Sequence, residues 1–249
     1  MAACIGYANK HNVGWGVKKG YVERGFNANQ VDKYLPQLPS CDSYFKAYKE
    51  FQEEWAGTEF NYHEIPFHPN GCELVGFWQS EKYFENAKDE VRKWINLPFV
   101  EGYRDYVSIH VRRGDYVQHS GSFPPVTLSY IDKAIATNHH ETGLAKFIVF
   151  SDDVQWCKEE LKKSRYNEWE FIYSEGRNEW EDLSLMASCG HNIIANSSFS
   201  WWGAWLNTNP NKIVISPSCK RGNWFGMEAG VKHDCVDLIP KEWIQIEFR

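Results

Sequence analysis

Residues 106–116 have the sequence Y-V-S-I-H-V-R-R-G-D-Y, and this stretch decides the fold that the sequence predicts. Tyr106 to Arg112 alternates in the manner of a β-strand. Because successive side chains of a strand point to opposite faces, Ile109 and Val111 are expected in the core, and His110 and Arg112 share the other face. Arg113 follows at a turn, where Gly114 allows a tight bend. The stretch therefore predicts a buried strand that ends in two arginines.

From this strand onward, expected strands and helices alternate with short links. Strands are expected at 106–112, 146–150, 169–173, 192–195 and 212–216, and helices at 130–136, 154–163, 180–189 and 200–206. Such alternation is typical of βαβ units around a mainly parallel sheet, and so of an α/β fold. In these sheets ligands bind beyond the carboxyl ends of the strands. The residues at those ends are therefore the candidates for function.

The first part of the chain has a weaker pattern, and two domains are expected, 1–103 and 104–249. A short helix is expected from Ala2, closing near residues 10–12. Residues 14–39 are irregular, 73–78 are an expected strand, and 81–97 are an expected helix.

The bulk composition excludes several classes of protein. The 249 residues carry a formal net charge of −6, which disfavours a nucleic-acid-binding protein. No apolar run approaches the roughly 20 residues that a membrane span needs, and the start has no signal-peptide pattern. The seven cysteines show no C-x-x-C spacing, so reduced thiols are expected. These features favour a cytoplasmic protein.

The first strand end carries Arg112 and Arg113. Two adjacent arginines are costly to bury without an anion, and the planar guanidinium suits a bidentate grip on phosphate oxygens. A diphosphate is the natural partner. The alternative is a surface ion pair between Arg113 and Asp115 with no ligand.

The second strand end carries Asp152 and Asp153. One is expected to cap the helix that begins at Val154, and the other is free to accept hydrogen bonds from a ribose or a guanine. A metal-binding pair is the alternative, but the carboxylates of metal-dependent transferases are usually separated by one residue, and these are adjacent.

The third strand end is the serine-rich turn Asn196-Ser197-Ser198-Phe199-Ser200, which opens a tryptophan-rich helix. Hydroxyl groups and free backbone N–H groups at a helix start form an anion site. The alternative is an ordinary N-cap followed by core tryptophans.

Four stretches resemble glycosyltransferase family 11, the α-1,2-fucosyltransferases. They are residues 76–84, 110–116, 150–153 and 196–206, in matching order and spacing, and H-x-R-R-G-D-Y together with S-x-F-S-W-W is a specific combination. The resemblance implies a GT-B-like architecture of two Rossmann-like halves, with the donor site in the cleft between them.

The resemblance also implies the chemistry. GDP-fucose would be the donor, a galactose-terminated glycan the acceptor, and the reaction would invert without a metal or other cofactor. Arg112 and Arg113 would hold the diphosphate and stabilise the departing GDP. His110 and Asp152 or Asp153 would contact the nucleotide, and Ser197, Ser198 and Ser200 the phosphate or fucose. No nucleic-acid partner and no transmembrane segment are expected, whereas peripheral association with a membrane is compatible with this chemistry.

One departure from the family pattern concerns the N-terminus. Family members begin with a strand and a loop of the type G-G-L-G-N-Q-x-F-Q, and this chain has no such segment. The N-terminal half is therefore expected to be incomplete, and the chain to be weakly active or inactive.

The sequence leaves the catalytic base open between Asp115, His119 and Glu81, or no dedicated base. Rival functions are an α-1,6- or protein O-fucosyltransferase, a degenerate sugar- or nucleotide-binding protein, and a metal-dependent transferase.

Overall fold

The computed structural model describes residues 1–17, 35–40, 49–52, 60–220, 222–229 and 235–247. Its contacts divide the chain into two compact units, Met1–Trp55 with Glu59–Asn96, and Ala56–Thr58 with Leu97–Arg249. Residues 97–103 group with the second unit, whereas the sequence analysis drew the limit after residue 103. Val100 and Tyr103 explain this grouping, because both pack on a core cluster of the second unit.

In its described residues, the first unit contains one small sheet and three helical segments. Strands β1 (Lys49–Gln52) and β2 (Cys72–Val75) pair in parallel. Helix α1 (Ala2–His11) packs on the 3-10 helix η1 (Glu81–Ala87) at Gly6, where an added Cβ would lie 1.9 Å from the Tyr83 carbonyl oxygen. The expected N-terminal helix is therefore confirmed, and a glycine is needed where it crosses its neighbour.

The single helix expected at 81–97 is in fact two helical segments. Ser80 caps η1 by accepting a hydrogen bond from the Lys82 backbone N–H, and α3 follows as Lys88–Ile95. Phe84 has φ −137° and interrupts the helical geometry inside η1. Asn96 ends α3 in the left-handed conformation with φ 45°, so the helix stops before Leu97.

The second unit is built on a six-stranded, fully parallel sheet. Its strands are β3 (Val107–Val111), β4 (Lys146–Ser151), β5 (Glu170–Tyr173), β6 (His191–Ile193), β7 (Val214–Pro217) and β8 (Ile244–Ile246). Its helices are α4 (Gly114–Gln118), α5 (Leu128–Thr142), α6 (Val154–Leu161), α7 (Glu179–Ser188) and α8 (Ser198–Leu206). The α/β class and the parallel sheet expected from the sequence are confirmed.

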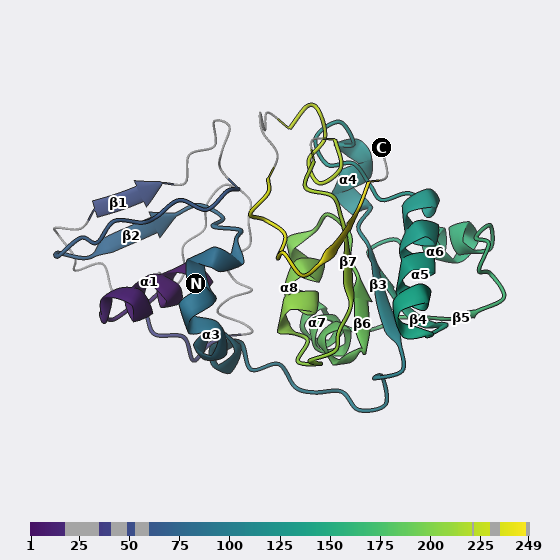
Figure 1. Ribbon diagram of the computed structural model, residues 1–249, viewed down its shortest axis with the longest axis horizontal. Helices are drawn as coiled ribbons and strands as arrows, with labels where there is room; N and C mark the ends of the chain where they lie inside the picture. Colours follow the sequence, from purple (N-terminus) through teal and green to yellow (C-terminus); the bar gives the residue numbers. More distant parts are fainter. Residues whose placement is uncertain (18–34, 41–48, 53–59, 221, 230–234, 248–249) are drawn as a thin grey trace. The chain divides into compact units, whose positions relative to one another are not determined.

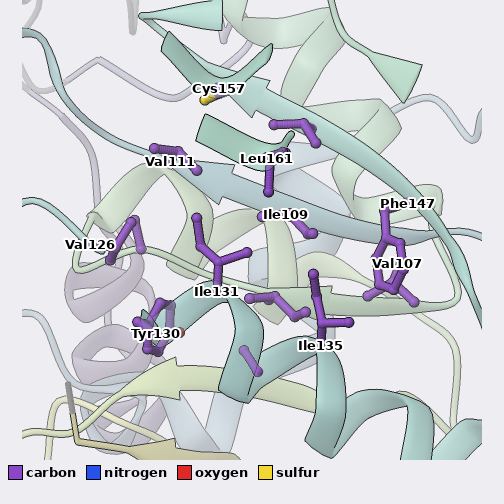
Figure 2. Close-up of a cluster of buried hydrophobic side chains, with 14 of the residues drawn as sticks. Val107, Ile109, Val111, Val126, Tyr130, Ile131, Ile135, Phe147, Cys157 and Leu161 are labelled. Atoms are coloured by element: carbon purple, nitrogen blue, oxygen red, sulfur yellow. The ribbon is translucent and has the colours of Figure 1, made fainter. Parts of the chain in front are cut away.

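Helices cover both faces of this sheet, with α5 and α6 on one side and α7 and α8 on the other (Figure 1). Figure 2 shows the core on the α5 side, where Ile109 and Val111 of β3 meet Ile131 and Ile135 of α5. The opposite cluster joins Ile148 and Phe150 of β4 to α7. Every residue of β3 is buried, as a central strand covered on both faces should be.

The strand order is β5-β4-β3-β6-β7-β8. From β3 the chain moves outward to β4 and β5, and then returns to place β6 on the other side of β3. This order is that of the Rossmann fold, which confirms the Rossmann-like character expected for the second half. The order reverses between β3 and β6, and ligands bind to such folds at that switch point.

Among the residues described, no helix has the length and apolar character that a bilayer crossing requires. A cytoplasmic location stays a prediction.

Candidate functional site

Three of the strand ends singled out in the sequence meet at the switch point. Strand β3 pairs with β4 up to Val111 and Ser151, and with β6 up to Ile109 and Ile193. The segments that follow these strands begin with Arg112, Asp152 and Ile194, so they leave the same edge of the sheet. The structure therefore brings together residues up to about 85 positions apart in the chain.

Arg112 is held between two carboxylates. Its Nη1 lies 2.7 Å from Oδ2 of Asp152, and its Nη2 lies 2.6 Å from Oδ1 of Asp115. The guanidinium also lies 5.6 Å from the ring centroid of Tyr116. Its side chain remains 36% exposed, so solvent and a ligand can reach it.

Arg113 has different partners from its neighbour. Its Nε donates to Oδ2 of Asp153 at 3.1 Å, and its guanidinium carbon lies 3.8 Å from the Trp156 ring centroid. Within the described part of the chain, its two terminal nitrogens have no acceptor. Stacking on Trp156 fixes the plane of the guanidinium while leaving those donors available.

Asp152 and Asp153 have different hydrogen-bond partners. Asp153 caps α6 by accepting a hydrogen bond from the Trp156 backbone N–H at 3.1 Å, so the expected capping role is confirmed for this residue. Asp152 accepts from the Arg113 backbone N–H at 2.8 Å and pairs with Arg112. An added Cβ at Gly114 would lie 2.5 Å from Oδ2 of Asp152, so a glycine is required beside this carboxylate.

The surface ion pair considered between Arg113 and Asp115 is not formed. Asp115 instead pairs with Arg112, three residues before it, because α4 begins at Gly114 and brings Asp115 back over the end of the strand. The Asp115 side chain is 60% exposed, so this pair is weak and screened.

His110 lies under the site and is 6% exposed. It is on the face expected from strand alternation, with its ring centroid 5.6 Å from that of Phe199. Burial lowers its pKa to about 4, so the imidazole is neutral near pH 7. Its Nδ1 is buried and meets no hydrogen-bond partner in the described part of the chain. His110 therefore brings no positive charge to an anion.

The three serines of the third strand end differ in exposure. Ser197 is the N-cap of α8 without a side-chain capping bond, and Ser198 is exposed at the first helical position. Ser200 is fully buried, and its hydroxyl lies 3.3 Å from the carbonyl oxygen of Ser197. Ser198 and the free N–H groups of this helix start are thus available to a ligand, whereas the hydroxyl of Ser200 faces the backbone.

Sequence reasoning missed three residues that shape the site, namely Trp156, Tyr116 and Asn196. Trp156 is on α6 and Arg113 follows β3, so their stacking is a long-range contact that no local spacing signals. The Tyr116 hydroxyl donates to the carbonyl oxygen of Asn196 at 3.0 Å, and burial raises its pKa to about 12. No local pattern predicts that long-range bond.

The three candidates for a catalytic base, Asp115, His119 and Glu81, have different surroundings. Asp115 is paired with Arg112, and His119 is exposed at the end of α4. Glu81 belongs to the first unit and pairs with Lys88 at 3.0 Å. In the described ranges, no group of three or more histidine, cysteine, aspartate or glutamate side chains is gathered in a metal-binding arrangement.

Comparison with known sequences places this site in a family. The α-1,2-colitosyltransferase of Escherichia coli is 37% identical over 238 residues, which are 89% of this chain and 75% of that protein. The O-antigen biosynthesis glycosyltransferase WbnK of Escherichia coli is 44% identical over 47% of this chain and 38% of its own length. The human galactoside α-(1,2)-fucosyltransferase 1 is 26% identical over 69% of this chain and 52% of its own.

Among solved structures, POFUT1 in complex with GDP-fucose matches 59% of this chain and 54% of its own at 15% identity, with a TM-score of 0.35. A similarity of this degree carries no argument about function. The family profile is decisive, because it matches residues 37–246 and so includes all the strand ends described above. The chain belongs to glycosyl transferase family 11.

Proposed function

We propose that this protein transfers L-fucose from GDP-fucose to the 2-hydroxyl of a terminal galactose on a glycan, with inversion and without a metal ion. The observation that carries the proposal is the Arg112–Arg113 pair at the switch point of a Rossmann-like sheet, in a chain of family 11. The α-1,2-fucosyltransferase named among its relatives supports the linkage and the sugar.

The two arginines are suited to a diphosphate in different ways. Arg113 already presents two terminal nitrogens, because Asp153 and Trp156 hold only the rest of its guanidinium. Arg112 can bind the diphosphate by giving up its ion pair with Asp115. This carboxylate is exposed, and a doubly charged diphosphate can displace it. Asp152 stays in place and keeps Arg112 oriented.

The start of α8 supplies a further group of donors. This helix has nine residues, and its first backbone N–H groups follow Ser197 directly beyond β6. Free N–H groups and the helix dipole favour an anion at this point. We assign the contact with phosphate or fucose to Ser197 and Ser198, and leave Ser200 a structural role. His110, neutral, and Asp152 or Asp153 are proposed to contact the nucleotide.

The two arginines act in the step in which GDP leaves the donor. The bond between the fucose C1 and the phosphate oxygen breaks, and the electron pair leaves with GDP, where the two guanidinium groups stabilise the developing charge. The galactose 2-hydroxyl oxygen forms the new bond to C1 from the opposite side, and its proton is released. The base that accepts this proton is left unassigned.

A second donor is favoured by one relative. The α-1,2-colitosyltransferase is 37% identical over most of this chain, and colitose is fucose without its 3-hydroxyl group. The contacts of Arg112 and Arg113 with the diphosphate would be the same for either nucleotide sugar. Competition between the two nucleotide sugars in one assay, with NMR of the product, would identify the donor and establish whether the linkage is to O2 of galactose.

The first test of the proposal is the binding of GDP, measured by calorimetry on the wild type and on Arg112→Ala. Losing one charge-assisted contact should cost about 1.5–3 kcal/mol, which is roughly tenfold or more in affinity. Arg165→Ala is a matched control, because this arginine is 73% exposed and its ion-pair partner, Asp132, lies outside the site. Equal loss in both variants, or no binding by folded wild type, would contradict the proposal.

Acceptor specificity separates the rival functions. Transfer to a terminal galactoside is expected, whereas transfer to a core N-glycan or to a protein domain would indicate the α-1,6- or O-fucosyl alternative. A protein that binds the glycan but neither GDP nor GDP-fucose would be a sugar-binding protein without catalysis.

A further inference from the structure

Asn196 connects three segments at the edge of the donor site. It lies three residues after β6 and is 2% exposed. Its Nδ2 donates to the carbonyl oxygen of Pro124 at 3.0 Å and to that of Trp224 at 2.9 Å. The main-chain carbonyl oxygen of Asn196 accepts the hydrogen bond from the Tyr116 hydroxyl.

The side-chain oxygen of Asn196 is the exception to this pattern. Oδ1 is buried and has no hydrogen-bond partner among the residues that the structure describes. An unsatisfied buried acceptor costs free energy, and a small apolar side chain would avoid that cost. The residue is therefore explained by what its Nδ2 holds.

The two segments joined by Nδ2 also contact each other. We call residues 119–126 the first loop and residues 222–229 the second loop. The backbone N–H of Gly226 donates to the Ser122 carbonyl at 2.8 Å, and that of Glu228 donates to the Gly121 carbonyl at 2.9 Å. Phe123 of the first loop stacks on Tyr116 with ring centroids 5.3 Å apart.

Tyr116 carries the connection to the donor site. Its hydroxyl is bonded to Asn196, one side of its ring contacts Phe123, and the Arg112 guanidinium lies 5.6 Å from its centroid. When Asp115 yields to a ligand, the Tyr116 ring and Asp152 are the partners that remain to orient Arg112.

We propose that Asn196 is a positioning residue. Through its Nδ2 it ties the first and second loops to the end of the sheet. The first loop in turn holds Phe123 against the ring of Tyr116, which lies beside Arg112, so that the grip on the donor diphosphate depends on Asn196. This inference rests on the proposed function for its effect on GDP, but its effect on the two loops stands without it.

Asn207 provides the matched control. It is also 2% exposed, and its Nδ2 also makes two hydrogen bonds, to the Cys189 carbonyl at 2.9 Å and to Oδ1 of Asn192 at 2.8 Å. It lies at the opposite, amino end of β6. A purely structural role for buried asparagines would make the two positions equivalent.

The experiment compares wild type, Asn196→Ser and Asn207→Ser by hydrogen exchange without ligand, and then by GDP calorimetry. In Asn196→Ser, exchange at the Gly226 and Glu228 amides is expected to rise about tenfold or more, because two bonds that hold the loops are lost. GDP affinity is expected to fall about fivefold or more. Asn207→Ser should leave both readouts near wild type.

The outcomes separate the two claims. Unchanged exchange in the loops, or faster exchange with unchanged GDP affinity, would overturn the positioning role. A wild type that does not bind GDP would refute the proposed function, while the exchange data would still decide whether Asn196 holds the loops. If Asn196→Ser does not fold, Tyr116→Phe replaces it, because it removes one hydroxyl bond and keeps the ring. Faster exchange in α4 and an affinity loss of about threefold are then expected, and wild-type behaviour would overturn the proposal.

Discussion

Arg112 and Arg113 are neighbours in the chain, yet different groups hold their guanidinium ions. Three carboxylates surround the two arginines, which leaves the unliganded site with a formal excess of one negative charge. Binding of an anion is therefore favoured when a carboxylate moves away, and Asp115 is the most exposed of the three. The sequence pointed to the arginines and the aspartates. The alternative that it left open paired Asp115 with Arg113, whereas Asp115 pairs with Arg112, because the short helix α4 has no periodic signature.

His110 makes the fold sensitive to acid. Burial lowers the pKa of its imidazole to about 4 in the folded protein, against about 6.5 in the unfolded chain. As pH falls, the unfolded chain takes up the proton first. The contribution of neutral His110 to the free energy of unfolding is therefore fully present above pH 6.5. It is lost progressively towards pH 4, by on the order of 3 kcal/mol.

Urea unfolding at pH 7, 6 and 5 measures this contribution. His110→Gln should lose less stability than wild type over that range, whereas His140→Gln, at an exposed position of α5, should follow wild type. Identical pH profiles for wild type and His110→Gln would mean that the buried imidazole is not what limits acid stability.

At the scale of elements, the sequence predicted more of the second half of the chain than of the first half. Strands and helices between residues 106 and 217 fell close to their expected places, because each has a strong apolar pattern. Among the elements that the structure describes, three were missed, namely β1, β8 and α4, which have only four, three and five residues. The expected helix at 81–97 is divided at Ala87, where φ −136° leaves the helical range between η1 and α3. A second departure from helical geometry lies inside η1, at the buried Phe84.

Helices α7 and α8 meet at a glycine, and an added methyl group at this contact should force the Met186 side chain to shift. An added Cβ at Gly203 would lie 2.4 Å from the Sδ of Met186. Gly203→Ala is expected to destabilise the protein by about 1–3 kcal/mol through overpacking. Thermal or urea unfolding measures the change.

A second substitution tests that cause. In a Met186→Ala background, Gly203→Ala should cost clearly less, because the clashing sulfur is gone. Gly14→Ala is the control, since an added Cβ there meets no atom within 4 Å. Additive losses in the double variant would show that the clash with Met186 is not the reason.

For the whole molecule, alternation in the sequence predicted a parallel sheet, and the resemblance predicted its Rossmann-like character. The strand order itself could not be derived locally, since it depends on β6 returning to β3 across residues 112–190. The same holds for the bond between Tyr116 and Asn196, which spans 80 positions. Contacts between residues far apart in the chain determine the geometry of the site, whereas the local sequence pattern predicts only which residues end the strands.

Transfer is expected to persist in EDTA. The two arginines bring to the diphosphate the positive charge that a metal ion would otherwise supply, and Asp152 and Asp153 are already bonded to them. Turnover of GDP-fucose should be equal with chelator and with added Mn²⁺. Loss of activity in EDTA and its recovery with Mn²⁺ would favour the metal-dependent alternative.

The return of β6 to the side of β3 also has a consequence for synthesis on the ribosome. After Val111 is made, the 79 residues 112–190 must be added before His191 appears, which takes about 4–16 s at 5–20 residues per second. Throughout that interval one edge of the most buried strand has no neighbour and can pair with another nascent chain. Slow translation of this stretch, or a shortage of chaperones, should therefore reduce the yield of folded enzyme more than a comparable delay after residue 193.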